Sequence, residues 1–125
     1  MVKFKNMNAF DYFFEHTYDL DKNFLVGKKE ISFRELHAQS MSLAGQIQKE
    51  IGEGKNVLLL SPNNVFCMVV YLAVIKSGNT IVPLDPMIEE ENFSYIREFS
   101  EAVKIFAAPP VKMRLKLAED EVVTE

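Results

Sequence analysis

The sequence is poor in the residues that build disulfides, metal centres and membrane spans. Among its 125 residues there is one cysteine, and the two histidines, His16 and His37, have no Cys or His at ligand spacing. Cys67 therefore cannot form an intrachain disulfide, and no metal site is expected. The longest apolar run, residues 65–75, is shorter than the roughly 20 residues of a membrane-spanning helix. Residues 1–10 lack the apolar stretch of a signal peptide, so we expect a cytoplasmic protein without a transmembrane segment.

An excess of basic residues is also missing. Lysine and arginine together number 14 against 18 aspartates and glutamates, which gives a formal net charge of −4. A nucleic-acid partner is therefore not expected, because such proteins carry a basic patch or stripe. What is present is a chain that is 48% hydrophobic and 26% charged, the composition of a folded globular domain.

The first elements are expected to be a helix and a hairpin. The spacing of phenylalanines in residues 8–18 predicts a helix, with Asn8 as its N-cap. Residues 24–26 and 31–33 have the composition of short strands, and Gly27 between them can adopt the positive φ of a tight turn. This pattern predicts a short N-terminal β-hairpin.

A long helix and a buried strand follow. Ser32 and Glu35 have the spacing of a capping box, and the apolar residues after them recur at helical spacing as far as Gly52. Residues 57–60 are apolar without polar alternation, which is typical of a strand that is covered on both faces. Asn63 is the expected N-cap of the next helix.

The second half of the chain continues the alternation of helices and strands. The apolar residues 65–75 predict the most buried helix. Residues 80–82 predict a strand that stops at Pro83, and residues 103–106 predict another strand. Between these strands, the glutamates at 89–91 are placed to begin a helix, because carboxylates stabilise the positive end of the helix dipole.

Helices between apolar strands indicate parallel pairing with right-handed crossovers. The predicted fold class is therefore α/β, a parallel β-sheet with helices on both faces, plus the short N-terminal β-hairpin. We divide the chain into an α/β subdomain, residues 1–106, and a tail, residues 107–125. One short helix is expected in the tail, over residues 111–118.

The candidate site lies at the strand ends, since ligands of such sheets bind beyond the carboxyl ends of the strands. These ends carry Ser61, Asn63 and Asp85, which are the candidate cofactor-binding residues. The alternative is that they only form turns and helix caps. Residues 52–56 resemble a phosphate loop, but they precede a strand and have no helix N-terminus behind them. We assign no catalytic residue, because no nucleophile elbow occurs and the carboxylates of residues 89–91 point in different directions.

Several segments, taken in order, resemble the adenylate-forming acyl-CoA synthetase family. They are residues 31–36 (ISFREL), 57–63 (VLLLSPN), 71–78 (YLAVIKSG), 81–86 (IVPLDP) and 103–106 (VKIF), together with Glu91, Tyr95 and Ile96 of the helix between the last two. Each motif alone is weak, and it is their order and spacing that make the resemblance specific. The resemblance extends over roughly residues 8–107.

The resemblance implies a two-step reaction. A carboxylate attacks the α-phosphate of ATP to give an acyl-adenylate, and a thiol, usually that of CoA, then displaces AMP. ATP, Mg²⁺ and CoA are the implied cofactors of the parent enzyme, and a long-chain fatty acid is the implied substrate.

The family's phosphate loop, its adenine and ribose contacts and its catalytic lysine lie downstream of the matched segments and are not found in this sequence. We therefore expect the amino-terminal part of a longer ligase, without cofactors or activity of its own and with an exposed apolar face that favours self-association. The alternative is a free-standing flavodoxin-like module that binds a nucleotide or a partner at the strand ends.

Overall fold

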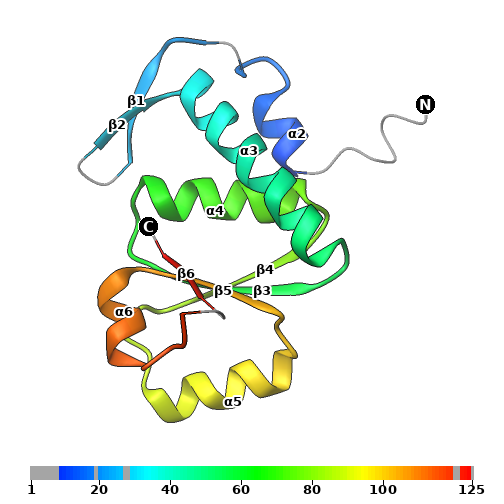
Figure 1. The fold of residues 1–125 in the computed structure, drawn as a ribbon. Helices are drawn as coiled ribbons and strands as arrows, with labels where there is room; N and C mark the ends of the chain where they lie inside the picture. Colours follow the sequence, from blue (N-terminus) through cyan, green and yellow to red (C-terminus); the bar gives the residue numbers. More distant parts are fainter. Residues whose placement is uncertain (1–8, 19, 27–28, 120–121, 125) are drawn as a thin grey trace.

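Four parallel strands form the central sheet of the computed structural model (Figure 1). The structure describes residues 9–18, 20–26, 29–119 and 122–124. The strands are β3 (Asn56–Leu60), β4 (Thr80–Leu84), β5 (Lys104–Ala107) and β6 (Val122–Thr124), and their order across the sheet is β4-β3-β5-β6. Each neighbouring pair is parallel, which confirms the predicted α/β fold class.

The apolar character of β3 is explained by helices that cover both faces of the sheet. Along β3, Val57 and Leu59 belong to one core, whereas Leu58 and Leu60 belong to the core on the opposite face. All four side chains are at most 2% exposed. Burial of each such side chain contributes roughly 1.5–3 kcal/mol, so the two cores together hold the sheet between its helices.

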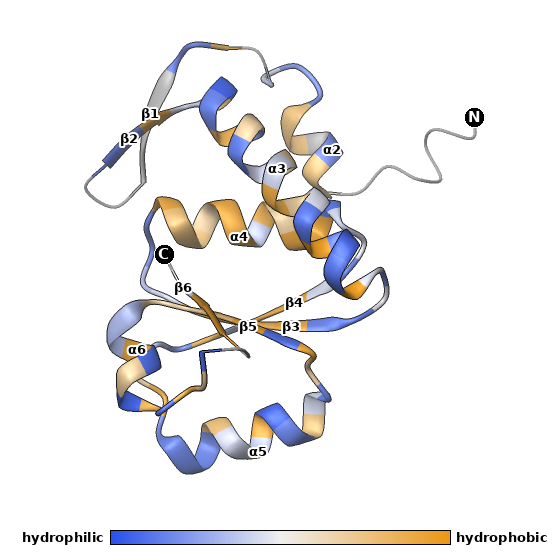
Figure 2. Ribbon diagram, viewed as in Figure 1, coloured by the Kyte–Doolittle hydropathy of each residue, from blue (hydrophilic) through white to orange (hydrophobic). Residues whose placement is uncertain are grey.

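The helices divide between the two faces and one outer layer (Figure 1). Their bounds are Ala9–Phe14 for α2, Phe33–Ile51 for α3, Val65–Lys76 for α4, Glu90–Ser100 for α5 and Pro109–Arg114 for α6. α3 and α4 pack on the face of Val57, and α5 and α6 pack on the face of Leu58. α4 lies between the sheet and two helices on the same side, α2 and α3. This position explains why α4 is apolar along most of its length (Figure 2).

The structure differs from the local predictions in several places, beginning with α2, which ends at Phe14 and not at residue 18. β4 continues through Pro83 as far as Leu84, because β4 is an edge strand and a proline there removes no hydrogen bond from the interior of the sheet. The helix expected over residues 111–118 begins earlier and occupies Pro109–Arg114. The sequence reasoning also missed β6, a strand of three residues that pairs with β5.

The N-terminal region contains a separate antiparallel pair, β1 (Asn23–Val26) with β2 (Lys29–Ser32). The turn expected at Gly27 and the N-cap expected at Asn8 lie outside the described residues. The predicted capping box is confirmed, because the Ser32 side chain accepts a hydrogen bond from the Glu35 backbone N–H at 3.1 Å and the Glu35 carboxylate accepts one from the Ser32 N–H.

The buried Asn79 side chain joins three segments at the amino end of the sheet. Its Oδ1 accepts a hydrogen bond from the Lys55 N–H at 2.8 Å, and its Nδ2 donates to the Gly52 carbonyl and to Ser77 Oγ, both at 2.9 Å. Asn79 is 7% exposed, so water cannot readily replace these bonds. One amide therefore fixes the end of α3, the end of α4 and the approach to β3.

We predict that Asn79→Ala lowers the free energy of unfolding by about 2–3 kcal/mol, because it leaves buried backbone groups without partners. Asn92→Ala is the matched control, since Asn92 is exposed on α5 and its loss is expected to change stability by less than about 0.5 kcal/mol. Urea unfolding followed by circular dichroism measures both. Equal losses in the two variants would contradict the role given to Asn79.

His37 of α3 packs among three aromatic rings close to α2. Its ring centroid lies 5.7 Å from that of Phe10, 4.9 Å from that of Phe14 and 5.5 Å from that of Tyr18. Burial lowers the pKa of His37 below its ordinary value of 6.5, and the positive charge of Lys76 lowers it further. The folded protein therefore favours the neutral imidazole.

A pH dependence of stability follows from this lowered pKa. As pH falls through 6.5, the unfolded chain binds a proton at His37 before the folded chain does, so stability decreases until the folded-state pKa is also passed. His37→Phe keeps an aromatic ring and is expected to flatten this decrease, whereas His16→Gln, at an exposed histidine, is expected to retain it. Urea midpoints between about pH 5 and pH 8 test this, and parallel curves for the wild type and His37→Phe would refute it.

Candidate functional site

The candidate site is the edge of the sheet at which the parallel strands end. Leu60 is in register with Leu84 of β4 and with Ala107 of β5, so the residues that follow them in the chain begin at neighbouring positions. Ser61 and Asp85, both predicted site residues, are therefore brought to the same edge. The backbone extends this alignment by one residue, because the Ala108 N–H donates to the Leu60 carbonyl at 3.0 Å.

The connections leave this edge in opposite directions. After β3 the chain enters α4 on one face of the sheet, whereas after β4 and β5 it enters α5 and α6 on the other face (Figure 1). β3 lies between β4 and β5, so the loop after β3 diverges from the loops on both of its sides. This divergence is the topological switch point at which open α/β sheets bind ligands.

The loop after β3 is held together by its own polar side chains. Ser61 is 8% exposed, and its Oγ donates to the Pro62 carbonyl at 3.0 Å. Asn64 Oδ1 accepts a hydrogen bond from the Cys67 N–H at 2.8 Å, which makes Asn64 the N-cap of α4. The prediction that Asn63 is the cap was wrong. The cap immediately precedes the first apolar residue of the helix, and this rule would have selected Asn64 from the sequence.

Asn63 itself is exposed and lines a pocket of about 410 Å³ between this loop, α2 and α4. The other residues that line it are mostly apolar: Phe13, Asn64, Cys67, Met68, Tyr71 and Leu72. Tyr71 is 43% exposed, so the outward side of α4 is less buried than its apolar sequence predicts.

Burial raises the pKa of the Cys67 thiol, and this outweighs a hydrogen bond with the Asn64 backbone that lowers it. A thiol with a raised pKa is not an activated nucleophile at neutral pH.

The loop after β4 is also internally bonded. Asp85 Oδ1 accepts a hydrogen bond from the Met87 N–H at 2.8 Å. Arg114 of α6 donates from its two terminal nitrogens to the Ile88 carbonyl at 2.8 Å and to the Pro86 carbonyl at 2.6 Å. Sequence reasoning missed Arg114, because its partners lie far from it in the chain. The side chains of Ser61 and Asp85 thus shape separate loops.

These bonds decide how well the strand-end residues fit ATP and Mg²⁺. The Ser61 hydroxyl and the Asp85 carboxylate already bond within their loops, and the Arg114 guanidinium is bound to backbone carbonyls. Within the described parts of the chain, no group of three or more His, Cys, Asp or Glu residues could hold a metal ion. The arrangement gives a rigid edge on which a ligand site can be built, but its side chains do not by themselves fit a nucleoside triphosphate.

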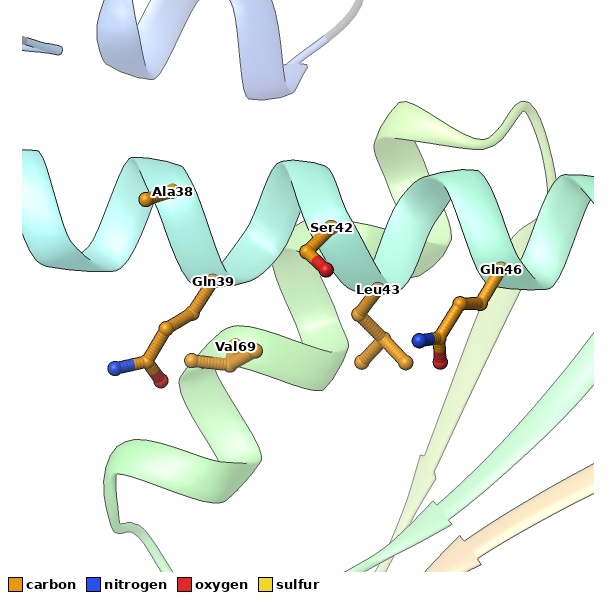
Figure 3. A pocket seen from close by; sticks show the side chains of 6 residues that line it. All are labelled: Ala38, Gln39, Ser42, Leu43, Gln46 and Val69. Atoms are coloured by element: carbon orange, nitrogen blue, oxygen red, sulfur yellow. The ribbon is translucent and has the colours of Figure 1, made fainter.

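A second pocket, of about 460 Å³, lies between α3 and α4 (Figure 3). Side chains of both helices line it: Ala38, Gln39, Ser42, Leu43, Gln46 and Val69. Figure 3 shows Gln39, Leu43 and Gln46 extending from α3 beside Val69 of α4. None of these residues can supply a charge for catalysis.

In the described residues, no helix is both long and apolar enough to cross a membrane.

Comparisons with known proteins give a consistent family. The sequence model of the family described as AMP-binding enzyme matches residues 14–125. Tyrocidine synthase 2 of Brevibacillus parabrevis is 34% identical over 76 residues, which are 60% of this chain and 2% of that protein. The chain thus spans a small part of this relative's length.

Two solved structures resemble the fold over most of the chain. The benzoate CoA ligase from Burkholderia xenovorans LB400 superposes with a TM-score of 0.84 and 15% identity, covering 95% of this chain and 26% of that one. The ATP-bound MatB from Rhodopseudomonas palustris superposes with a TM-score of 0.75 and 23% identity, covering 95% of this chain and 25% of that one. The chain therefore spans about a quarter of the length of each of these structures.

The corrected cap leads to a paired prediction. Asn64→Ala removes the side chain that satisfies the first turn of α4 and is expected to lower the free energy of unfolding by about 1 kcal/mol. Asn63→Ala, one residue earlier at an exposed position, is expected to change it by less than about 0.5 kcal/mol. Urea unfolding of the two variants separates them. A larger loss for Asn63→Ala would restore the original assignment of the cap.

Proposed function

The chain belongs to the family of AMP-binding enzymes, and we propose from this membership that it forms the amino-terminal α/β part of an adenylate-forming ligase. The observation that carries the proposal is the extent of the family match, which includes the entire four-stranded sheet and the switch point after β3. The order and spacing of the strand-end motifs, residues 57–63 and 81–86, agree with it.

The proposed reaction of the whole enzyme has two steps. A carboxylate oxygen attacks the α-phosphorus of ATP, the bond to the bridging oxygen breaks, and pyrophosphate leaves with the electron pair. A thiolate then attacks the acyl carbon, the acyl–phosphate bond breaks, and AMP leaves as a thioester forms. ATP with Mg²⁺ supplies the activated phosphate, and stabilisation of the charge that develops on it is the usual source of rate in such chemistry.

In this reaction, the residues of the 125-residue chain have a supporting role. The bonds of Ser61, Asn64 and Asp85 fix the loops at the carboxyl edge of the sheet, and Arg114 holds the loop after β4 to α6. We propose that this rigid edge positions substrate-binding segments contributed by the rest of the enzyme. On this proposal, the 125 residues alone neither bind ATP tightly nor catalyse adenylation.

The finer proposal names the acid and the acceptor. We propose a fatty acid as the carboxylate and CoA as the thiol, on the strength of the general resemblance of the chain to acyl-CoA synthetases. Neither tyrocidine synthase 2 nor the benzoate CoA ligase is named for a fatty acid, so we include an amino acid and an aromatic acid as competing acids. A substrate panel must therefore include all three classes.

The experiment is ATP–pyrophosphate exchange, measured with the 125-residue chain and with the complete product of the reading frame that contains it. The panel consists of palmitate, octanoate, benzoate and phenylalanine. We expect exchange from the complete product with a fatty acid and none from the 125-residue chain. Absence of exchange with every acid would overturn the adenylation proposal, and exchange with benzoate or phenylalanine alone would overturn the finer one.

Calorimetry of the 125-residue chain with ATP, AMP and CoA distinguishes the flavodoxin-like alternative. A supporting part of a ligase is expected to give no saturable heat with any of the three ligands. Saturable binding that is lost in Asp85→Ala would instead show a self-sufficient nucleotide site at the strand ends.

A further inference from the structure

The outer surface of α5 carries two stacked aromatic side chains. Tyr95 is 63% exposed and Phe99 is 79% exposed, and their rings lie 5.9 Å apart between centroids at an interplanar angle of 9°. A single exposed apolar residue is ordinary on a protein surface, but an ordered aromatic pair with this much exposed area is a common feature of interaction sites.

Helix geometry places this pair away from the core. Phe93, which is 3% exposed, packs under α5 in the core that it forms with the sheet, and Ile96 packs beside it. Tyr95 and Phe99 are four residues apart on one side of the helix, and this side is turned away from Phe93. α5 is the outermost element on its face of the sheet, so nothing in the described residues covers this side (Figure 1). The fold therefore does not require aromatic residues at these positions.

Carboxylates flank the aromatic pair. Glu91 lies four residues before Tyr95 and Glu98 three residues after it, which places both beside the rings on the same helix surface. Both glutamates are exposed, and neither forms an ion pair with another described residue. Along residues 89–101, five glutamates accompany one arginine, so α5 and its two flanking residues carry an excess of negative charge. We call Glu91, Tyr95, Glu98 and Phe99 the α5 face.

We infer that the α5 face is a docking surface for an arginine-bearing segment of another protein. A guanidinium group can stack on an aromatic ring and pair with a carboxylate at the same time, and the α5 face offers both within one helical turn. Anionic membranes and nucleic acids would be repelled by the glutamates. A second copy is disfavoured because contact between two α5 faces would bring like charges together. This inference goes beyond the proposed ligase function and does not depend on it.

The test uses a defined probe. A fluorescein-labelled amphipathic helical peptide with leucines on one face and arginines beside them is titrated with the 125-residue chain, and anisotropy reports binding. Its twin carries glutamate at every arginine position. We expect saturable binding of the arginine peptide that weakens as salt rises, and none of the glutamate peptide.

Variants locate the interaction. Tyr95→Ser with Phe99→Ser is expected to weaken binding at least tenfold, and Glu91→Gln with Glu98→Gln to weaken it and reduce its salt dependence. Met113→Ser is the matched control, since Met113 is 80% exposed on α6 and its loss should leave binding unchanged. Unfolding midpoints confirm that each exposed substitution leaves the fold intact.

Three results would overturn the inference. Equal binding of the glutamate peptide would show that the α5 face does not select cations. Unchanged affinity in the Tyr95→Ser, Phe99→Ser variant would place binding elsewhere. Concentration-dependent dimerisation that disappears in this variant would make a second copy the occupant. Adenylation by the complete product is measured separately, so failure of this inference and failure of the proposed function are distinguishable.

Discussion

The enclosure of β3 on every side is the constraint on which the rest of the structure depends. Two parallel strands pair with its edges, and helices cover both of its faces. Its apolar side chains are essentially inaccessible to water, so a polar residue in the strand would lose its hydration without finding a partner. This explains the uninterrupted apolar run of residues 57–60, and it confines polar chemistry to the two ends of the strand.

At both ends of β3, asparagine side chains bind backbone groups that the ends of the neighbouring helices and the start of the strand leave without partners. At the amino end, Asn56 Nδ2 donates to the Ser100 carbonyl at 2.8 Å, and Asn79 binds the chain at Lys55. At the carboxyl end, Asn64 caps the helix that follows. Each amide can both donate and accept, which suits it to places where a strand end meets a helix end. The strand-end residues that resemble family motifs therefore have structural work before any ligand is present.

The local pattern of the sequence was sufficient to predict the parallel sheet, since apolar runs of strand length alternate with segments of helix length along residues 57–106. It was insufficient wherever contacts between residues distant in the sequence determine the local structure. Pro83 lies within a strand because β4 is at the edge of the described sheet, and strand order is not visible in the sequence. The three residues of β6 are too few to show a period, and they are defined by pairing with β5. Ser61 and Asp85 were correctly placed at the same edge of the sheet, whereas the bonds from Arg114 to the loop after β4 link segments distant in sequence.

The contrast between α4 and α5 shows which surface features the fold demands. α4 lies between the sheet and two other helices, so most of its apolar side chains are required for packing. α5 packs through one side only, and Phe93 and Ile96 supply that side. Stability alone would be served equally well by polar residues at positions 95 and 99, which would also keep the surface more soluble. The exposed aromatic pair is therefore best explained by a contact that the described residues do not themselves provide.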